Sequence, residues 1–294
     1  MNLFLQLLLN GLINGCAYAL VAVGFALIYN TTRIFHFAHG GIYVLSGYLF
    51  FSFYTQSGLP LWFALLITLL LAAIAGILID WLVYRPLDQR GASTIMYMIS
   101  SFGVYVIIIS GICMLYGNHP RVVHAPLPTF SFGGITLNAI QITTAVIFIA
   151  VFVALVFTLK YSSLGLKLRA MRDNQTLLAL YGINPNNTRL CIFGVGSALC
   201  ALAAILVSVD TGIDPHVGMK MVMTAAVAVI VGGIGVFAGV AAGALILGGL
   251  QGIAVWLTST QWQDLVTFAV LIFCLLFRPQ GILGYRGRLE EDET

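Results

Sequence analysis

Long apolar runs, separated by short polar segments, dominate the sequence. A membrane-spanning helix needs about 20 mostly apolar residues, because the hydrocarbon core is roughly 30 Å thick and a helix rises about 1.5 Å per residue. Two runs, 42–55 and 264–277, are short for a full crossing. The pattern predicts an all-α polytopic membrane protein with about eight or nine hydrophobic segments, including short, broken or re-entrant helices, in one domain over residues 1–294. The candidate spans cover residues 3–29, 42–55, 61–83, 94–116, 141–159, 190–209, 222–257 and 264–277.

Composition supports a membrane protein. Apolar residues make up 60% of the chain and charged residues only 8%, against about 25% charged residues in soluble domains. The net charge of +3 gives no basic surface for nucleic acid. All five cysteines lie in apolar stretches without a C-x-x-C pair, so we expect small buried side chains. The first apolar run lacks a basic start and is long for a cleaved signal peptide, which predicts a retained span.

Lysines and arginines gather in three regions, which predicts the orientation. Ten of the thirteen lie at 85–90, at 160–189 and at 278–288. Because cytoplasmic loops are enriched in basic residues, these regions are expected to be cytoplasmic. The N-terminus and the loop 117–140 are then outside, and the C-terminal tail 278–294 is cytoplasmic.

The apolar stretch 222–257 must begin and end outside in this topology, so one straight helix is excluded. The glycines of 230–239 are the expected place for a break. Two full crossings and a re-entrant hairpin both satisfy the topology. The four-residue spacing of Gly235, Gly239 and Gly243 favours close helix packing, and a lining of the transport path is the alternative.

Few polar side chains interrupt the apolar runs. Asn10 and Asn14 lie on one face of the first span, where they serve interhelical hydrogen bonds or a solute path. Asp80 lies near Arg85 and is expected to form an interfacial ion pair with it. Three further polar residues are expected at the outer surface, where they are solvated or contact a substrate ammonium group or a delivering receptor. These are Asp210, Asp214 and His216.

Two histidines, His36 and His39, precede Gly40 and lie three residues apart. Such a pair supplies only two of the three or four ligands of a typical zinc site, and the other histidines are predicted outside. We therefore predict no metal site. The sequence carries no G-x-S-x-G or H-E-x-x-H motif, so an enzymatic function is not expected.

The loop 160–189 carries an amphipathic pattern that predicts a helix over 164–181. A basic helix on anionic lipid and a docking element for a partner protein both fit the pattern.

Several motifs in this loop and elsewhere occur in a recognisable order. The loop contains Gly165, Arg169-Ala170, Asp173-Asn174 and Gly182-Ile183. Together with the motifs below, it resembles the branched-chain amino-acid permease family of ABC importers over nearly the whole chain. His36 stands where that family usually has Asn, and Leu178 where a small Ala is usual. The other motifs are HFAHG at 36–40, YRP at 84–86, GIDPHVG at 212–218, the glycine-rich segment 225–248 and RPQGILG at 278–284.

The resemblance implies a permease subunit in a bacterial inner membrane. Its partners would be two cytoplasmic ATPases, a second permease subunit and an extracytoplasmic solute-binding protein. The sequence has no G-x-x-x-x-G-K-[ST] loop, so ATP and Mg would be used by the partners and no cofactor by this chain. The ATPase-coupling residues implied are Gly165, Arg169, Ala170, Arg172, Asp173, Asn174 and Gly182. The candidates for the substrate path are Asn10, Asn14, His36, His39, Gly40, Thr224, Gly232, Gly233 and Gly235.

The predicted function is therefore a translocation path for a small polar or amphipathic solute: a branched-chain or other amino acid, a short amide or urea. The alternative is a self-sufficient channel or a proton-coupled secondary transporter, in which His36, His39, Asp210 or Asp214 would carry protons.

Overall fold

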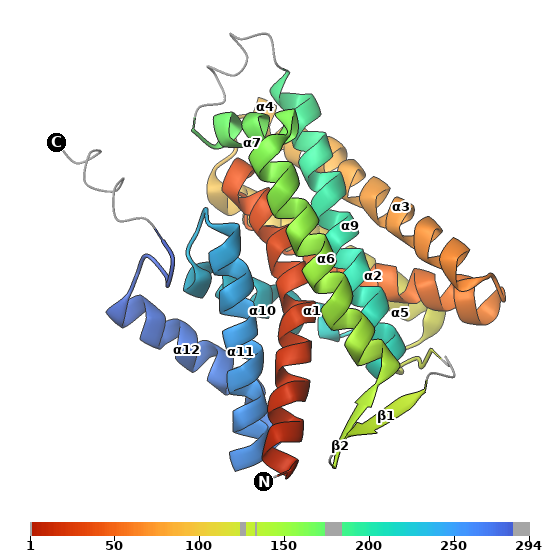
Figure 1. Ribbon diagram of the computed structural model, residues 1–294. Helices are drawn as coiled ribbons and strands as arrows, with labels where there is room; N and C mark the ends of the chain where they lie inside the picture. Colours follow the sequence, from red (N-terminus) through yellow and green to blue (C-terminus); the bar gives the residue numbers. More distant parts are fainter. Residues whose placement is uncertain (1, 124–127, 133, 174–183, 285–294) are drawn as a thin grey trace.

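The apolar runs of the sequence become helices in the computed structural model, which describes residues 2–123, 128–132, 134–173 and 184–284 (Figure 1). The helices of the first half are α1 (Asn2–Thr32), α2 (Ala38–Phe51), α3 (Leu61–Ile79), α4 (Arg85–Gln89) and α5 (Thr94–Tyr116). Those of the second half are α6 (Ala139–Tyr161), α7 (Ser163–Asp173), α9 (Pro185–Thr211), α10 (Val217–Gly232), α11 (Phe237–Leu257) and α12 (Gln263–Phe277). Short turns of other helix types are the π-helical η1 (Ser52–Gln56) and η2 (Asp80–Tyr84) and the 3₁₀-helical η3 (Thr260–Trp262).

Within the described residues, seven helical segments are long and apolar enough to cross a membrane. This confirms the predicted all-α polytopic fold. Two further apolar helices are shorter: α2 has 14 residues and α10 has 16, about 21 Å and 24 Å at about 1.5 Å per residue. The segment at 264–277, predicted to be short, gains η3 and reaches span length as Thr260–Phe277.

The predicted break within 222–257 is present. Helix α10 ends at Gly232, and α11 begins at Phe237. Gly233 and Gly235 adopt φ values of 107° and 94°, a region open to glycine and strained for other residues. Helix α10 is thus a short helix, whereas α11 is long enough to span.

Glycines allow the central helices to touch backbone to backbone. Gly24 of α1 meets Gly196 of α9, where an added Cβ would lie 2.6 Å from the Gly196 carbonyl oxygen. Gly11 of α1 packs in the same way on Gly248 of α11, and Gly40 of α2 on Gly218 of α10. The hydrophobic effect does not drive helices together in lipid, so close packing at such glycines stabilises their association instead.

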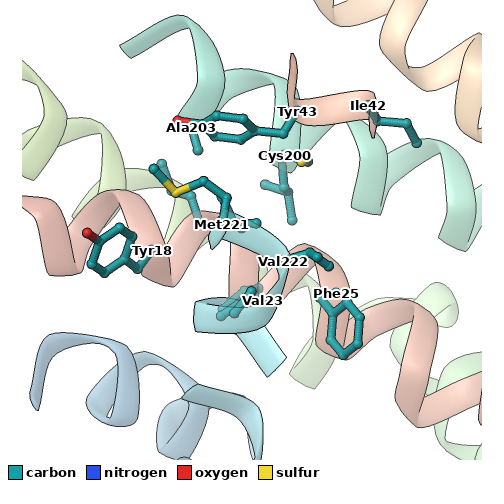
Figure 2. Close-up of a cluster of buried hydrophobic side chains, with 14 of the residues drawn as sticks. Tyr18, Val23, Phe25, Ile42, Tyr43, Cys200, Ala203, Met221 and Val222 are labelled. Atoms are coloured by element: carbon teal, nitrogen blue, oxygen red, sulfur yellow. The ribbon is translucent and has the colours of Figure 1, made fainter. Parts of the chain in front are cut away.

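The apolar core lies where α1, α2, α9 and α10 meet. Phe25, Tyr43, Cys200 and Val222 are among its buried members (Figure 2). Helices α5, α6 and α12 instead expose apolar side chains, as lipid-facing helices do. Of the five cysteines expected to be buried, Cys16, Cys200 and Cys274 are, but Cys113 is half-buried and Cys191 exposed. Cys113 still packs against the apolar core.

The ends of the molecule differ. One end, at the top of Figure 1, carries α4, α7 and the start of α9, and we call it the α7 end. The opposite end carries an unpredicted antiparallel hairpin of β1 (Thr129–Phe132) and β2 (Ile135–Asn138), and we call it the hairpin end. There Arg121 also pairs with Ile213. The basic residues 85–90 and 160–169 and Arg189 share the α7 end, as the predicted alternation of spans requires.

Candidate functional site

A small cavity of about 90 Å³ opens between α1, α11 and the start of α12. Asn10 and Asn14 line it from α1, because residues four apart share one helix face. Gln251 of α11 and Gln263 of α12 line it from the other side. We call the cavity formed around these four carboxamides the amide pocket. Its other lining residues are Leu7, Gly11, Gly252, Val255 and Thr260.

The four carboxamides give the amide pocket both hydrogen-bond donors and acceptors without a net charge. Gln6 donates to Asn10 Oδ1 at 3.2 Å, and Gln251 Nε2 donates to the Thr267 hydroxyl at 2.7 Å. Asn14 is exposed. The sequence indicated Asn10 and Asn14 but not Gln263, because the position of Gln263 depends on how the chain returns after α11.

An ion pair adjoins the amide pocket. Lys220 Nζ of α10 lies 2.8 Å from Asp264 Oδ1 of α12, and Asp264 directly follows Gln263 in the sequence. The side chains are 35% and 56% exposed. Sequence reasoning did not pair them, although an aspartate at the start of an apolar segment was a usable signal.

His36 and His39 lie elsewhere, in the packed interior. His36 Nδ1 and the Tyr84 hydroxyl share a 2.7 Å hydrogen bond, and His39 Nε2 donates to the Val21 carbonyl at 3.3 Å. Both side chains are fully buried. Among the described residues no group of three or more His, Cys, Asp or Glu is arranged to hold a metal. The histidines thus join α2 to α1 and to η2, and direct contact with a solute would require these helices to separate.

The other path candidates also have packing roles in this structure. Gly40 packs on Gly218, and Gly232 on Gly239. The buried Thr224 donates its hydroxyl to the Lys220 carbonyl at 2.9 Å. Gly233 and Gly235 form the turn between α10 and α11. Only Asn10 and Asn14 of the predicted path residues line the amide pocket.

The charged residues at the α7 end form a larger network than the sequence predicted. The expected pair of Asp80 and Arg85 is present, at 3.6 Å. The closer partner of Asp80 is Arg189 of α9, at 2.6 Å, and Arg189 also contacts Asp88 at 2.6 Å. The π-helical turn η2 places Asp80 and Tyr84 in the interior. The partner came from a helix more than 100 residues away, which local spacing does not indicate.

Helix α7 lies across the α7 end, within the loop predicted to couple to ATPases. Gly165 packs against the Leu159 backbone of α6, and Arg169 Nη1 donates to the Leu159 carbonyl at 2.6 Å. Arg169 therefore satisfies a carbonyl near the end of α6.

One side of α7 faces the protein: Met171 is buried, and Ala170 packs on the core. The predicted helix over 164–181 is described only to Asp173. Asn174 and Gly182 lie outside the described residues, and the side chains of Arg172 and Asp173 are not described.

Asp210, Asp214 and His216 lie at the hairpin end, and their location at the outer surface stays a prediction. Asp214 Oδ1 accepts the His216 backbone N–H at 2.7 Å, and His216 Nε2 lies 2.7 Å from Asn118 Oδ1. They therefore order the loops that precede α10, and a receptor contact stays a prediction.

Comparison with known proteins decides the family. Residues 7–275 match the family described as "Branched-chain amino acid transport system / permease component". The chain belongs to this permease family. It is 32% identical to the high-affinity branched-chain amino acid transport system permease protein BraD of Pseudomonas aeruginosa, with 96% of each chain covered. It is 31% identical to the corresponding permease protein LivH of Escherichia coli, again with 96% coverage.

A solved structure shares the fold of this permease. It is PsaBC from Streptococcus pneumoniae in complex with Fab, with a TM-score of 0.53, 14% sequence identity and coverage of 94% of this chain and 92% of the other. At that identity the likeness supports the fold alone. The family membership agrees with the resemblance carried by the sequence motifs.

Proposed function

We propose that this chain is the membrane-spanning permease subunit of an ABC importer for a small polar or amphipathic solute, with branched-chain amino acids as the first candidates. The observation that carries the proposal is its likeness to BraD and LivH over 96% of each chain. Other amino acids, short amides and urea stay within the proposed solute class.

The solute path would follow the polar face of α1. Asn10, Asn14 and Tyr18 recur every four residues on this helix. The exposed Asn14 lies 12 residues from the first residue of α1, about 18 Å along the axis at about 1.5 Å per residue. An exposed carboxamide at that depth is unfavourable against hydrocarbon. This face is therefore expected to meet water or the second permease subunit.

Coupling to ATP would occur through α7. Leu166 and Arg169 are exposed on this helix, whereas Gly165 and Arg169 also fix it to α6. Because α7 contacts both α6 and α9, a movement of α7 would reach both helices directly. Two ATPase subunits, which use ATP and Mg, would bind here, and this chain itself would not be an enzyme.

The remaining assembly follows from the same proposal. A second permease subunit, related or identical, and an extracytoplasmic solute-binding protein complete the transporter in the bacterial inner membrane. The N-terminus would be outside and the tail from Arg278 cytoplasmic, which places the α7 end beside the ATPases.

The test is solute uptake into proteoliposomes by the permease with and without its ATPases. We expect uptake only with both ATPases and ATP, and Leu166→Asp should reduce ATPase co-purification and uptake together. Gln56→Asp, an exposed change at the end of η1, is the matched control and should change neither. Uptake by the permease alone would support the channel or secondary transporter instead.

Arg169→Glu and Gly182→Pro are the variants that the sequence motifs suggest. Because Arg169 also binds the Leu159 carbonyl, Arg169→Glu is expected to shift α7 on α6 as well as to weaken ATPase binding. Leu166→Asp is therefore the cleaner test of the docking surface.

A further inference from the structure

The ion pair of Lys220 and Asp264 continues the polar face of α1 beyond the amide pocket. Tyr18, one turn after Asn14, lies close enough to Asp264 for the two groups to interact electrostatically. Figure 2 shows the Tyr18 hydroxyl directed away from the apolar side chains around it. Asn10, Asn14 and Tyr18 thus lead along α1 toward the two charges.

The ion pair of Lys220 and Asp264 is expected to contribute little to the stability of the fold, because water solvates both charges of an exposed pair well. Charged side chains within a membrane-spanning segment are nevertheless costly, and Asp264 lies within the candidate span Thr260–Phe277. A charge pair with small benefit to the fold, beside a cavity whose lining includes four carboxamides, is typical of a binding site.

We propose that Lys220 and Asp264 bind the carboxylate and the ammonium group of a zwitterionic amino acid, whose body lies in the amide pocket. This inference rests on the proposed transport function and deepens it. Lys220 is the fourth residue of α10, so the positive end of that helix dipole adds to its attraction for a carboxylate. Leu7 and Val255 supply apolar surface for a side chain.

The exchange leaves no charge unpaired. A zwitterion that inserts between Lys220 and Asp264 replaces one ion pair by two, at no change in net charge. A solute with a single charge leaves one protein charge without a partner, which is unfavourable away from water. An uncharged solute such as urea provides a counterion for neither Lys220 nor Asp264. The pair therefore selects zwitterions over both other classes.

The experiment uses the complete transporter with its ATPases and binding protein, and compares uptake of radiolabelled leucine and urea. Lys220→Gln and Asp264→Asn, singly and combined, should each lower leucine uptake by about tenfold or more, as expected for lost hydrogen bonds to charged groups. The double variant should be no better than the poorer single variant. Gln56→Asp, the exposed change at the end of η1, is again the control and should transport leucine normally.

A purely structural pair gives the opposite pattern. Each single variant then leaves one charge without its partner, and the combined variant restores uptake because neither charge remains. Recovery of uptake in the double variant overturns the inference. Transport of urea but not of leucine by the wild-type transporter also overturns it, while leaving the permease function intact. Absence of ATP-dependent uptake of every solute tested overturns the proposed function itself.

Discussion

The two ion clusters of this permease differ in burial and in connection. Asp80 is fully buried and Arg189 is 6% exposed, and Arg189 bridges Asp80 and Asp88 at 2.6 Å each. Lys220 and Asp264 form a single exposed contact beside the amide pocket. The same chemical groups therefore hold helices together in one region and lie accessible to a solute in the other.

The difference arises from the surrounding helices. Arg189 lies over the Phe193 ring, 5.9 Å from its centroid, and the packed helices α3 and α9 bury Asp80 and Arg189, whereas the Asp88 side chain is 57% exposed. Lys220 and Asp264 instead lie near the starts of α10 and α12, beside an open cavity. Removing one partner of a buried ion pair destabilises the fold strongly, whereas removing one partner of an exposed pair has only a small effect on stability.

Asp80→Leu tests the buried cluster and is expected to have the largest effect. It leaves Arg189 without its one fully buried carboxylate partner and should destabilise the permease by about 3–5 kcal/mol. Combining it with Arg189→Met should recover part of this loss, because both buried charges are then absent. Thermal unfolding of the purified permease measures both, and an Asp80→Leu variant that unfolds at the wild-type temperature would contradict the assigned pairing.

Gly248→Ala tests the helix crossing that supports the exposed region. Its Cβ would collide with the backbone of Gly11 and Gly15, so we expect a loss of about 1–3 kcal/mol and a disturbed amide pocket. Gly111→Ala in α5 is the matched control, since a Cβ there meets nothing within 4 Å. Equal thermal stability of the two variants would show that the α1–α11 contact is looser than described.

His36→Asn separates a packing role from a path role. Loss of the hydrogen bond to Tyr84 should cost about 1 kcal/mol, while the relative uptake of different solutes should be unchanged because His36 lies away from the amide pocket. Competition uptake assays measure that preference. A changed solute preference would place His36 at the path after all.

The exposed pair should give the smallest change in stability. Lys220→Gln and Asp264→Asn are each expected to alter the free energy of unfolding by less than about 1 kcal/mol, although both should impair transport. Chemical denaturation of the purified variants tests this. A loss of stability as large as that caused by Asp80→Leu would show that the two ion clusters do not differ in their contribution to the fold.

The sequence predicted the helical fold, the break at Gly233 and the shared face of Asn10 and Asn14, because these follow from apolar periodicity and glycine chemistry. It did not predict the Arg189 partner of Asp80, Gln263 in the amide pocket, or the Lys220 pair. Each depends on contacts between distant segments, which local spacing does not encode. The sequence also left the role of His36 open, because a polar residue near a helix break gives the same pattern whether it faces a path or the interior. Its path role stays a prediction, which His36→Asn tests.

The most direct test of the account is the water accessibility of position 14. Asn14→Cys is introduced into the complete transporter after the five native cysteines are replaced, and is treated with a charged, membrane-impermeant thiol reagent. Ile107→Cys is the control, because Ile107 is 72% exposed near the middle of α5 and should face lipid. We predict that Asn14→Cys reacts, that transported solute slows the reaction, and that Ile107→Cys does not react. An Asn14→Cys variant as unreactive as Ile107→Cys would contradict a solute path along α1.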